Sequence, residues 1–163
     1  THHDLPAATV REMVHIAHEK GFAVMSHTNG KRAVLDAIEA GVDSVEHANY
    51  IDDECIAALS ESRTCYVPTA TVARNLIGTG QFPDSVLKSI VETSYENISK
   101  AVEVGCLVAL GSDAGAVGVP HGQGALDEYA CFAMAVSDTM SRDAALTRGE
   151  TFVRDTFKRA DAC

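Results

Sequence analysis

The chain has 163 residues, of which 46% are hydrophobic and 22% are charged, and its formal net charge is -10. This length suffices for one domain with its own core. The acidic balance argues against nucleic acid and anionic membrane surfaces as partners. No run of about 18 apolar residues occurs, so we expect no membrane-spanning helix.

The five cysteines favour a reducing compartment. Their number is odd, and no two of them are spaced as a CxxC pair. At this spacing we interpret them as small apolar residues of the interior rather than zinc ligands. We therefore expect a cytoplasmic protein.

Helices that end at glycine alternate with short apolar runs. Glycine readily adopts the left-handed backbone that closes a helix. Each of three apolar runs follows such a glycine and stops at a side chain that can bind a metal. The first expected unit is a helix over 4–20, capped by Asp4 and ended by Gly21, followed by a strand over 22–27. The second is a helix over 31–40, ended by Gly41, and a strand over 42–47. The third is a helix over 84–104, capped by Asp84 and ended by Gly105, and a strand over 106–113.

The other segments complete the same alternation. Residues 70–83 form a long connection, and connections of this length are usually functional or mobile. We also expect a helix from Asp52 or Asp53 to about 62, a strand over 65–69, a glycine-rich loop over 111–124, and helices over about 125–136 and 141–158.

Four strands that alternate with helices predict an α/β fold with a parallel sheet. The strands are continuous apolar runs, which are typical of strands covered on both faces. Four such units amount to half of a TIM-type (β/α)8 barrel, and a small open sheet is the alternative. Since no nucleotide-binding fingerprint follows a strand, we expect the half barrel, with four parallel strands and flanking helices in one domain over 1–163.

His27, His47 and Asp113 end three of the expected strands. The carboxyl ends of parallel strands share one rim, where ligands bind in α/β folds. Imidazole and carboxylate groups are zinc ligands, and three of them leave a position for water. The alternatives are core histidines bonded to backbone carbonyls and an Asp113 that caps its own loop.

Six motifs support a family resemblance from about residue 10 to about residue 157. They are His27-Thr28-Asn29-Gly30, residues 41–47, Tyr66-Val67-Pro68-Thr69, residues 108–115, Pro120-His121-Gly122 and residues 140–146. Together they resemble the metal-dependent amidohydrolase superfamily, in the branch of imidazolonepropionase-like enzymes and Xaa-Pro or Xaa-Arg dipeptidases.

The resemblance implies that the chain corresponds to barrel strands five to eight. His27 then closes strand five, His47 closes strand six and Asp113 closes strand eight. The family's first-strand His-x-His pair, its strand-four lysine or glutamate and its C-terminal β-sandwich have no counterpart in the sequence.

The implied activity is hydrolysis of a C–N bond by metal-activated water, with an amide, cyclic amide or dipeptide as substrate. The resemblance implies one or two divalent metals in the complete parent, and we expect zinc. Asp113 would be both ligand and general base. We expect His121, Tyr50 and Arg74 to bind substrate, and the alternative for them is a surface or rim position without chemistry.

A non-catalytic half-barrel scaffold is the second function that fits the sequence. The strands that end at His27 and Asp113 would each lack a neighbour, and unpaired edges favour association. We therefore expect a homo-oligomer or pairing with a complementing N-terminal half. Bound metal distinguishes the enzyme from the scaffold.

Overall fold

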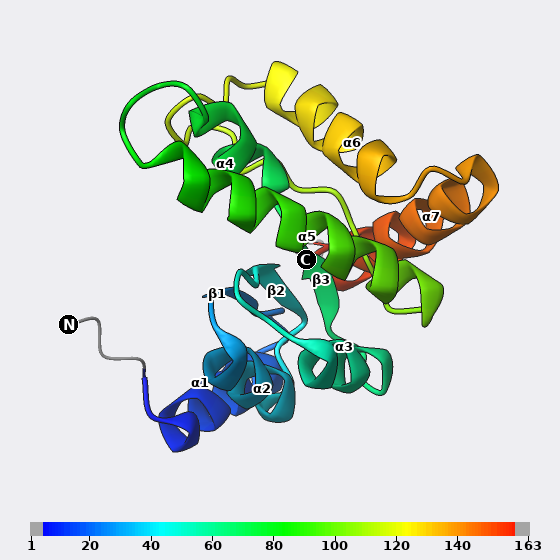
Figure 1. Cartoon of the computed structure of the whole chain (residues 1–163). Coiled ribbons are helices and arrows are strands. Elements are labelled where there is room, and N and C mark those ends of the chain that lie inside the picture. The colour runs from blue at the N-terminus through cyan, green and yellow to red at the C-terminus, as the bar shows by residue number, and fades with distance from the viewer. Residues whose placement is uncertain (1–4, 159–163) are drawn as a thin grey trace.

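The computed structural model describes residues 5–158, in which helices and strands alternate before a helical second half (Figure 1). The helix cap expected at Asp4 lies outside the described residues. The elements are α1 (Ala7–Glu19), β1 (Met25–Thr28), α2 (Lys31–Ala40), β2 (Ser44–His47), α3 (Asp53–Ser60), β3 (Cys65–Val67), α4 (Ala70–Leu76), α5 (Asp84–Glu103), α6 (Gln123–Ala135) and α7 (Thr139–Thr156).

The three strands form one parallel sheet in the order β1-β2-β3. The register pairs His27 with Glu46 and Glu46 with Val67. Because successive side chains of a strand point to opposite faces, these three residues share one face, and Val45 and Tyr66 lie on the other. The expected α/β fold with parallel strands is confirmed.

The fourth expected strand, 106–113, pairs with the sheet only through a bridge at Val108. The N–H of Tyr66 donates to the carbonyl of Leu107 at 2.8 Å, and the N–H of Ala109 donates to the carbonyl of Tyr66 at 3.0 Å. No further bridge follows Val108 along this segment, and the backbone is left-handed at Asp113, whose φ is 54°.

Helices pack on both sides of the strands (Figure 1). Their buried side chains form two hydrophobic cores with those of the sheet. The larger core covers the face with Val45, Tyr66 and Val108, and it includes Val34, Leu59, Ile98 and Phe132 from the helices. The smaller core lies on the opposite face, where Cys65, Val67 and Ala109 contact Phe152 and Val153 of α7. The sheet is thus buried on both faces at β3.

α7 covers the free side of the Val108 segment. The bridge uses both backbone groups of Tyr66, so the carbonyl of Val108 points away from β3. A Cβ atom on Gly149 would stand 1.9 Å from that carbonyl oxygen. The helix reaches the backbone only because residue 149 is glycine, and the edge expected to lie unpaired here is occupied.

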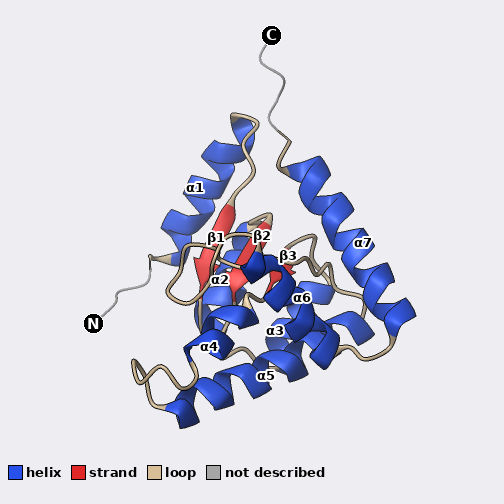
Figure 2. Cartoon of the chain, turned by 90° about the horizontal axis from the view of Figure 1, so that it is seen from above, coloured by secondary structure: helices blue, strands red, loops and turns tan. Residues whose placement is uncertain are grey.

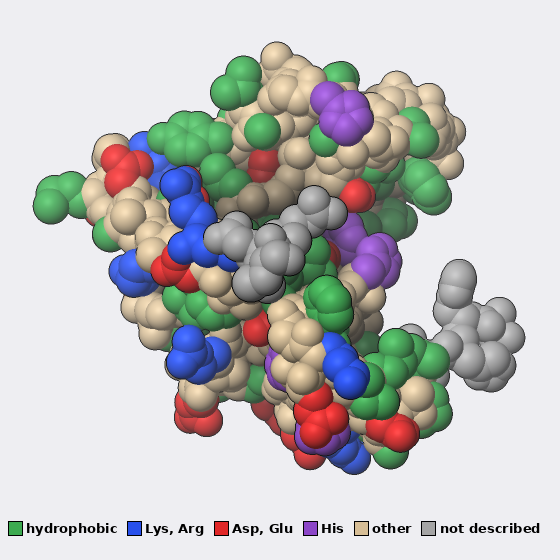
Figure 3. All heavy atoms as spheres, turned by 180° about the vertical axis from the view of Figure 1, so that it is seen from behind, with side chains coloured by type: hydrophobic (Ala, Val, Ile, Leu, Met, Phe, Trp, Pro, Cys, Tyr) green, Lys and Arg blue, Asp and Glu red, His purple; other side chains and the backbone are tan. Residues whose placement is uncertain are grey.

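The opposite edge of the sheet is different. Within residues 5–158, β1 pairs only with β2, and α1 and α7 lie at opposite sides of the sheet (Figure 2). Met25 of β1 is 58% exposed and the preceding Phe22 is 69% exposed. Hydrophobic and histidine side chains reach the surface on the face seen from behind (Figure 3). The sheet therefore has one covered edge and one open edge.

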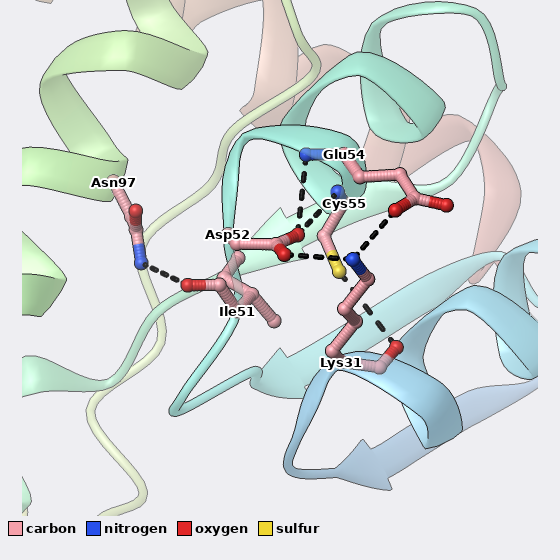
Figure 4. A network of polar contacts seen from close by, with 6 residues as sticks. All are labelled: Lys31, Ile51, Asp52, Glu54, Cys55 and Asn97. Carbon is pink, nitrogen blue, oxygen red and sulfur yellow. Dashed lines mark hydrogen bonds and ion pairs between the residues drawn. The ribbon is translucent and has the colours of Figure 1, made fainter.

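A polar network fixes the connection between β2 and α3 (Figure 4). The Asp52 carboxylate accepts the N–H of Glu54 at 3.1 Å and caps α3, as the sequence predicts. Lys31 of α2 pairs with Asp52 at 2.8 Å and with Glu54 at 2.5 Å, and its hydrogen bond lowers the pKa of Asp52. Asn97 of α5 donates to the carbonyl of Ile51 at 3.5 Å. The network joins the starts of α2 and α3 to α5.

Two local expectations are corrected. The connection 70–83 contains the helix α4, which propensity alone does not reveal. Asp84 does not cap α5; its carboxylate accepts the N–H of Gly78 at 2.8 Å, and Pro83 occupies the cap position.

Four cysteines lie in the described part of the chain, and all four are buried free thiols, as expected. They are Cys55, Cys65, Cys106 and Cys131. Among residues 5–158, no helix combines the length and the apolar character that crossing a bilayer requires.

The close approach of α7 predicts the effect of Gly149→Ala. Alanine favours helix by about 1 kcal/mol over glycine, but here its methyl group would overlap the Val108 carbonyl. We expect the free energy of unfolding to fall by about 1–3 kcal/mol, as for an overpacked core. Urea denaturation measures the change, and Arg148→Ala, at the exposed neighbouring position, should leave stability nearly unchanged. A Gly149→Ala protein as stable as wild type would contradict the packing.

Candidate functional site

Two histidines meet at the carboxyl ends of β1 and β2. The register pairs Thr28 with His47, which places His27 beside the last residue of β2. Nε2 of His47 lies 2.8 Å from Nδ1 of His27, and the rings meet edge to face with centroids 4.4 Å apart. Parallel pairing of neighbouring strands thus brings the two predicted ligands into direct contact.

Thr69, two residues after the end of β3, contacts the other side of the His47 ring. Its Oγ1 lies 2.5 Å from Nδ1 of His47. Sequence reasoning included Thr69 in a motif but gave it no role in the site. The available signal was its position at the end of a strand, directly after Pro68.

Several residues at this rim have strained backbone conformations. Non-glycine residues rarely adopt positive φ, which costs about 1–3 kcal/mol and persists where the surroundings enforce it. All five such residues in the described chain follow or end a strand-like segment: His47, Ala48, Tyr50, Thr69 and Asp113. The strain marks the same end of the sheet as the histidine pair.

Asp113 acts on this rim through its charge. Burial lowers the pKa of His47, the nearby His27 lowers it further, and Asp113 opposes the change. Burial also raises the pKa of Glu46, which shares a face with His27; a hydrogen bond from Ser44 opposes that rise and the charge of Asp113 adds to it. Asp113 therefore lies close enough to affect both groups. Sequence reasoning missed the half-buried Glu46.

The donor types suit a divalent metal in part. Two imidazole nitrogens that bind one tetrahedral zinc at 2.0–2.1 Å stand about 3.3 Å apart, so the His27–His47 separation of 2.8 Å needs only a small opening. Within residues 5–158, no three His, Cys, Asp or Glu side chains converge as a metal site. Asp113 therefore does not complete a three-ligand cluster in this arrangement.

An apolar groove of about 290 Å³ opens beside His47 and Thr69, between α4 and α5. It includes Asn49 and Tyr50 at the rim. Its apolar lining comes from Ala70, Val72, Ala73, Leu76, Phe82, Val86, Leu87 and Ile90.

The three predicted substrate-binding residues lie in different places. Tyr50 is 65% exposed and borders the groove. Arg74 points toward α6, where its Nη1 lies 4.0 Å from the sulfur of Cys131. His121 is exposed in the loop before α6, with its Nε2 4.0 Å from the position of a Cβ on Gly115. Only Tyr50 thus joins His47 at the groove.

Known proteins of similar sequence are considerably longer than this chain. An uncharacterized protein of Mycobacterium tuberculosis is 31% identical over 120 residues, which are 70% of this chain and 32% of that protein. Ochratoxinase of Aspergillus niger is 30% identical over 95 residues, which are 55% of this chain and 20% of that protein. The chain spans a third or less of these relatives.

Solved structures share the fold. A Xaa-Pro dipeptidase with methionine bound in its active site is 26% identical with a TM-score of 0.77, covering 95% of this chain and 39% of that one. For the Aspergillus niger ochratoxinase structure the identity is 24% and the TM-score 0.75, with 91% of this chain and 34% of that one covered. The fold is therefore that of part of a TIM-type barrel.

The sequence pattern of the Amidohydrolase family matches residues 2–153. The matched range includes His27, His47, Thr69 and Asp113. The chain therefore belongs to the amidohydrolase family.

Proposed function

We propose that this chain carries the later strands of the barrel of a metal-dependent hydrolase of C–N bonds. The observation that carries the proposal is the contact between His27 and His47 at the ends of adjacent parallel strands. Family membership supports hydrolysis of amide bonds, and the buried free cysteines support a reducing cytoplasm.

His27 and His47, already in contact, would hold the metal, and Asp113 would join them once its carboxylate moves closer to the two rings. Zinc suits these mixed nitrogen and oxygen ligands. The bound ion would supply a Lewis acid and a water of lowered pKa. Asp113 would accept a proton from the attacking water and pass it to the leaving nitrogen. Thr69 would keep the His47 ring oriented, as groups behind metal ligands commonly do.

The substrate is an amide, cyclic amide or dipeptide with one apolar side chain. The groove beside His47 is lined mainly by aliphatic residues and Phe82, so it suits an uncharged group of modest size. The bound methionine of the similar dipeptidase supports this choice. Tyr50, which borders the groove, would contact the polar part of the substrate.

Association through β1 is the second candidate function. In the described part of the chain, β1 pairs on one side only and exposes Met25, so it suits a further strand. The strand would come from a second copy or from a segment that carries the family's earlier strands. In the scaffold alternative, this association occurs without catalysis.

Removal of either imidazole tests the metal site. After equilibration of the purified chain with zinc, we expect one ion or more per chain by elemental analysis. Loss of a residue that supports a metal ligand typically weakens metal binding by about 10- to 100-fold. His27→Ala and His47→Ala each remove a ligand itself, so each should weaken zinc binding by more than this. His15→Ala, on the exposed face of α1, is the matched control. A folded chain that takes up no zinc would favour the scaffold.

Asp113→Asn separates proton transfer from metal binding. We expect zinc content to persist while the hydrolytic rate falls by about 10²- to 10⁴-fold, the usual contribution of a general base. The rate is measured on a dipeptide with the chain alone and with a segment carrying the family's earlier strands. Asp138→Asn keeps a good helix cap and should retain full activity. An unchanged rate in Asp113→Asn would exclude the proposed proton acceptor.

A charge placed in the groove tests the substrate class. Ala73→Arg should weaken binding of N-acetyl-leucine amide at least about tenfold, since one methylene in an apolar pocket already contributes that much. Binding of N-acetyl-glycine amide should change little. NMR titration measures both affinities, and Ala130→Arg, on the exposed side of α6, provides the control. Equal losses for both ligands would argue against side-chain recognition by the groove.

A further inference from the structure

Glu128 is a carboxylate buried completely in the middle of α6. Its two oxygens accept backbone N–H groups at the start of α4: Ala70 donates to Oε1 at 3.1 Å and Thr71 donates to Oε2 at 2.8 Å. Burial raises the pKa of Glu128, while these hydrogen bonds and the charge of Arg74 oppose the rise. Each oxygen therefore has a defined partner on a helix 57 or 58 residues away in sequence.

These two bonds replace the usual cap of α4. The first N–H groups of a helix have no partner within it, and a threonine before the helix normally accepts one with its hydroxyl. Thr69 occupies that position but makes no such bond, and its backbone is left-handed, with φ 51° and ψ 38°. Because Glu128 accepts the helix N–H groups, the Thr69 hydroxyl remains available for Nδ1 of His47.

We propose that Glu128 is a positioning residue for His47, acting through α4 and Thr69; its relevance to catalysis rests on the proposed function, in which His47 is a metal ligand. Glu128 fixes the start of α4, this start holds Thr69 in its strained conformation, and Thr69 accepts a hydrogen bond from Nδ1–H of His47. The ring is thereby kept in the tautomer whose Nε2 carries no hydrogen, so its lone pair faces Nδ1 of His27 and can bind a metal.

Glu128→Gln changes this arrangement with little change in volume. A glutamine amide offers one acceptor, so its NH2 group would oppose one of the two backbone donors. We expect the Thr69 hydroxyl to turn toward α4 in response. The ring nitrogens of His47, observed by ¹⁵N NMR at a pH where the ring is neutral, should shift from the Nδ1–H tautomer toward a mixture.

Two variants bracket this measurement. Thr69→Val removes the hydroxyl directly and should give the same mixed tautomers. Leu126→Ala, at an exposed position of the same helix α6, leaves both Glu128 hydrogen bonds in place and should preserve the wild-type tautomer. His15, exposed on α1, serves as the internal reference. A wild-type His47 protonated at Nε2, or a Glu128→Gln protein with unchanged His47 signals, would overturn the proposal.

Hydrogen exchange in the wild-type chain provides a second test that needs no variant. The amides of Ala70 and Thr71 should exchange far more slowly than those of an uncapped first turn, because a buried carboxylate holds them. Fast exchange at both amides would overturn the proposal even if Glu128→Gln does not fold.

Zinc binding separates this inference from the proposed function. If both are correct, Glu128→Gln should weaken zinc affinity by about 10- to 100-fold. A wild-type chain that binds no zinc but shows the tautomer change would refute the metal site and leave the positioning role intact. Strong zinc binding by the wild-type chain, with no response of the His47 signals to Glu128→Gln, would support the metal site and refute the positioning role.

Discussion

The parallel pairing of β1 with β2 is the constraint on which the candidate site depends. Strands that run in the same direction end at the same rim, and the pairing of Thr28 with His47 brings the two imidazoles into contact. A slip of one residue would turn every side chain of a strand to the opposite face. His27 would then enter the helix-covered core, so the buried side chains of that core also secure the site.

The residues with strained backbones in this structure are also those held by contacts from other elements. His47 and Thr69 both have left-handed backbones, which their own sequences do not favour. Each is held by contacts from another element: His47 by β1 and by Thr69, and Thr69 by a helix start that Glu128 anchors from α6. The rim is thus assembled from segments that are distant in sequence, while the sheet beneath it is regular.

The sequence predicted correctly those elements that depend on local interactions, and it failed where contacts between distant residues decide the structure. The helix 31–40 and the presence of β1 and β2 were predictable because glycine stops and apolar runs are local signals. The strand bounds were less accurate, since β1 begins at Met25 rather than Phe22 and ends at Thr28, one residue after His27. α4 was missed because its start depends on Glu128, which lies 58 residues from Ala70. The contact of Gly149 with Val108, and the direction of Arg74 toward Cys131, likewise depend on tertiary packing that no local pattern contains.

The covered edge at Gly149 makes growth of the sheet directional. α7 packs against the carbonyl of Val108 and blocks a new strand from pairing there. Among the described strands, β1 is the one beside which a further strand can join the sheet. Two identical copies related by a two-fold axis would align their β1 strands antiparallel, because an isologous contact reverses the chain direction. Continuation in the parallel sense therefore requires a strand of different sequence, so the geometry of this one edge distinguishes self-pairing from completion of a barrel.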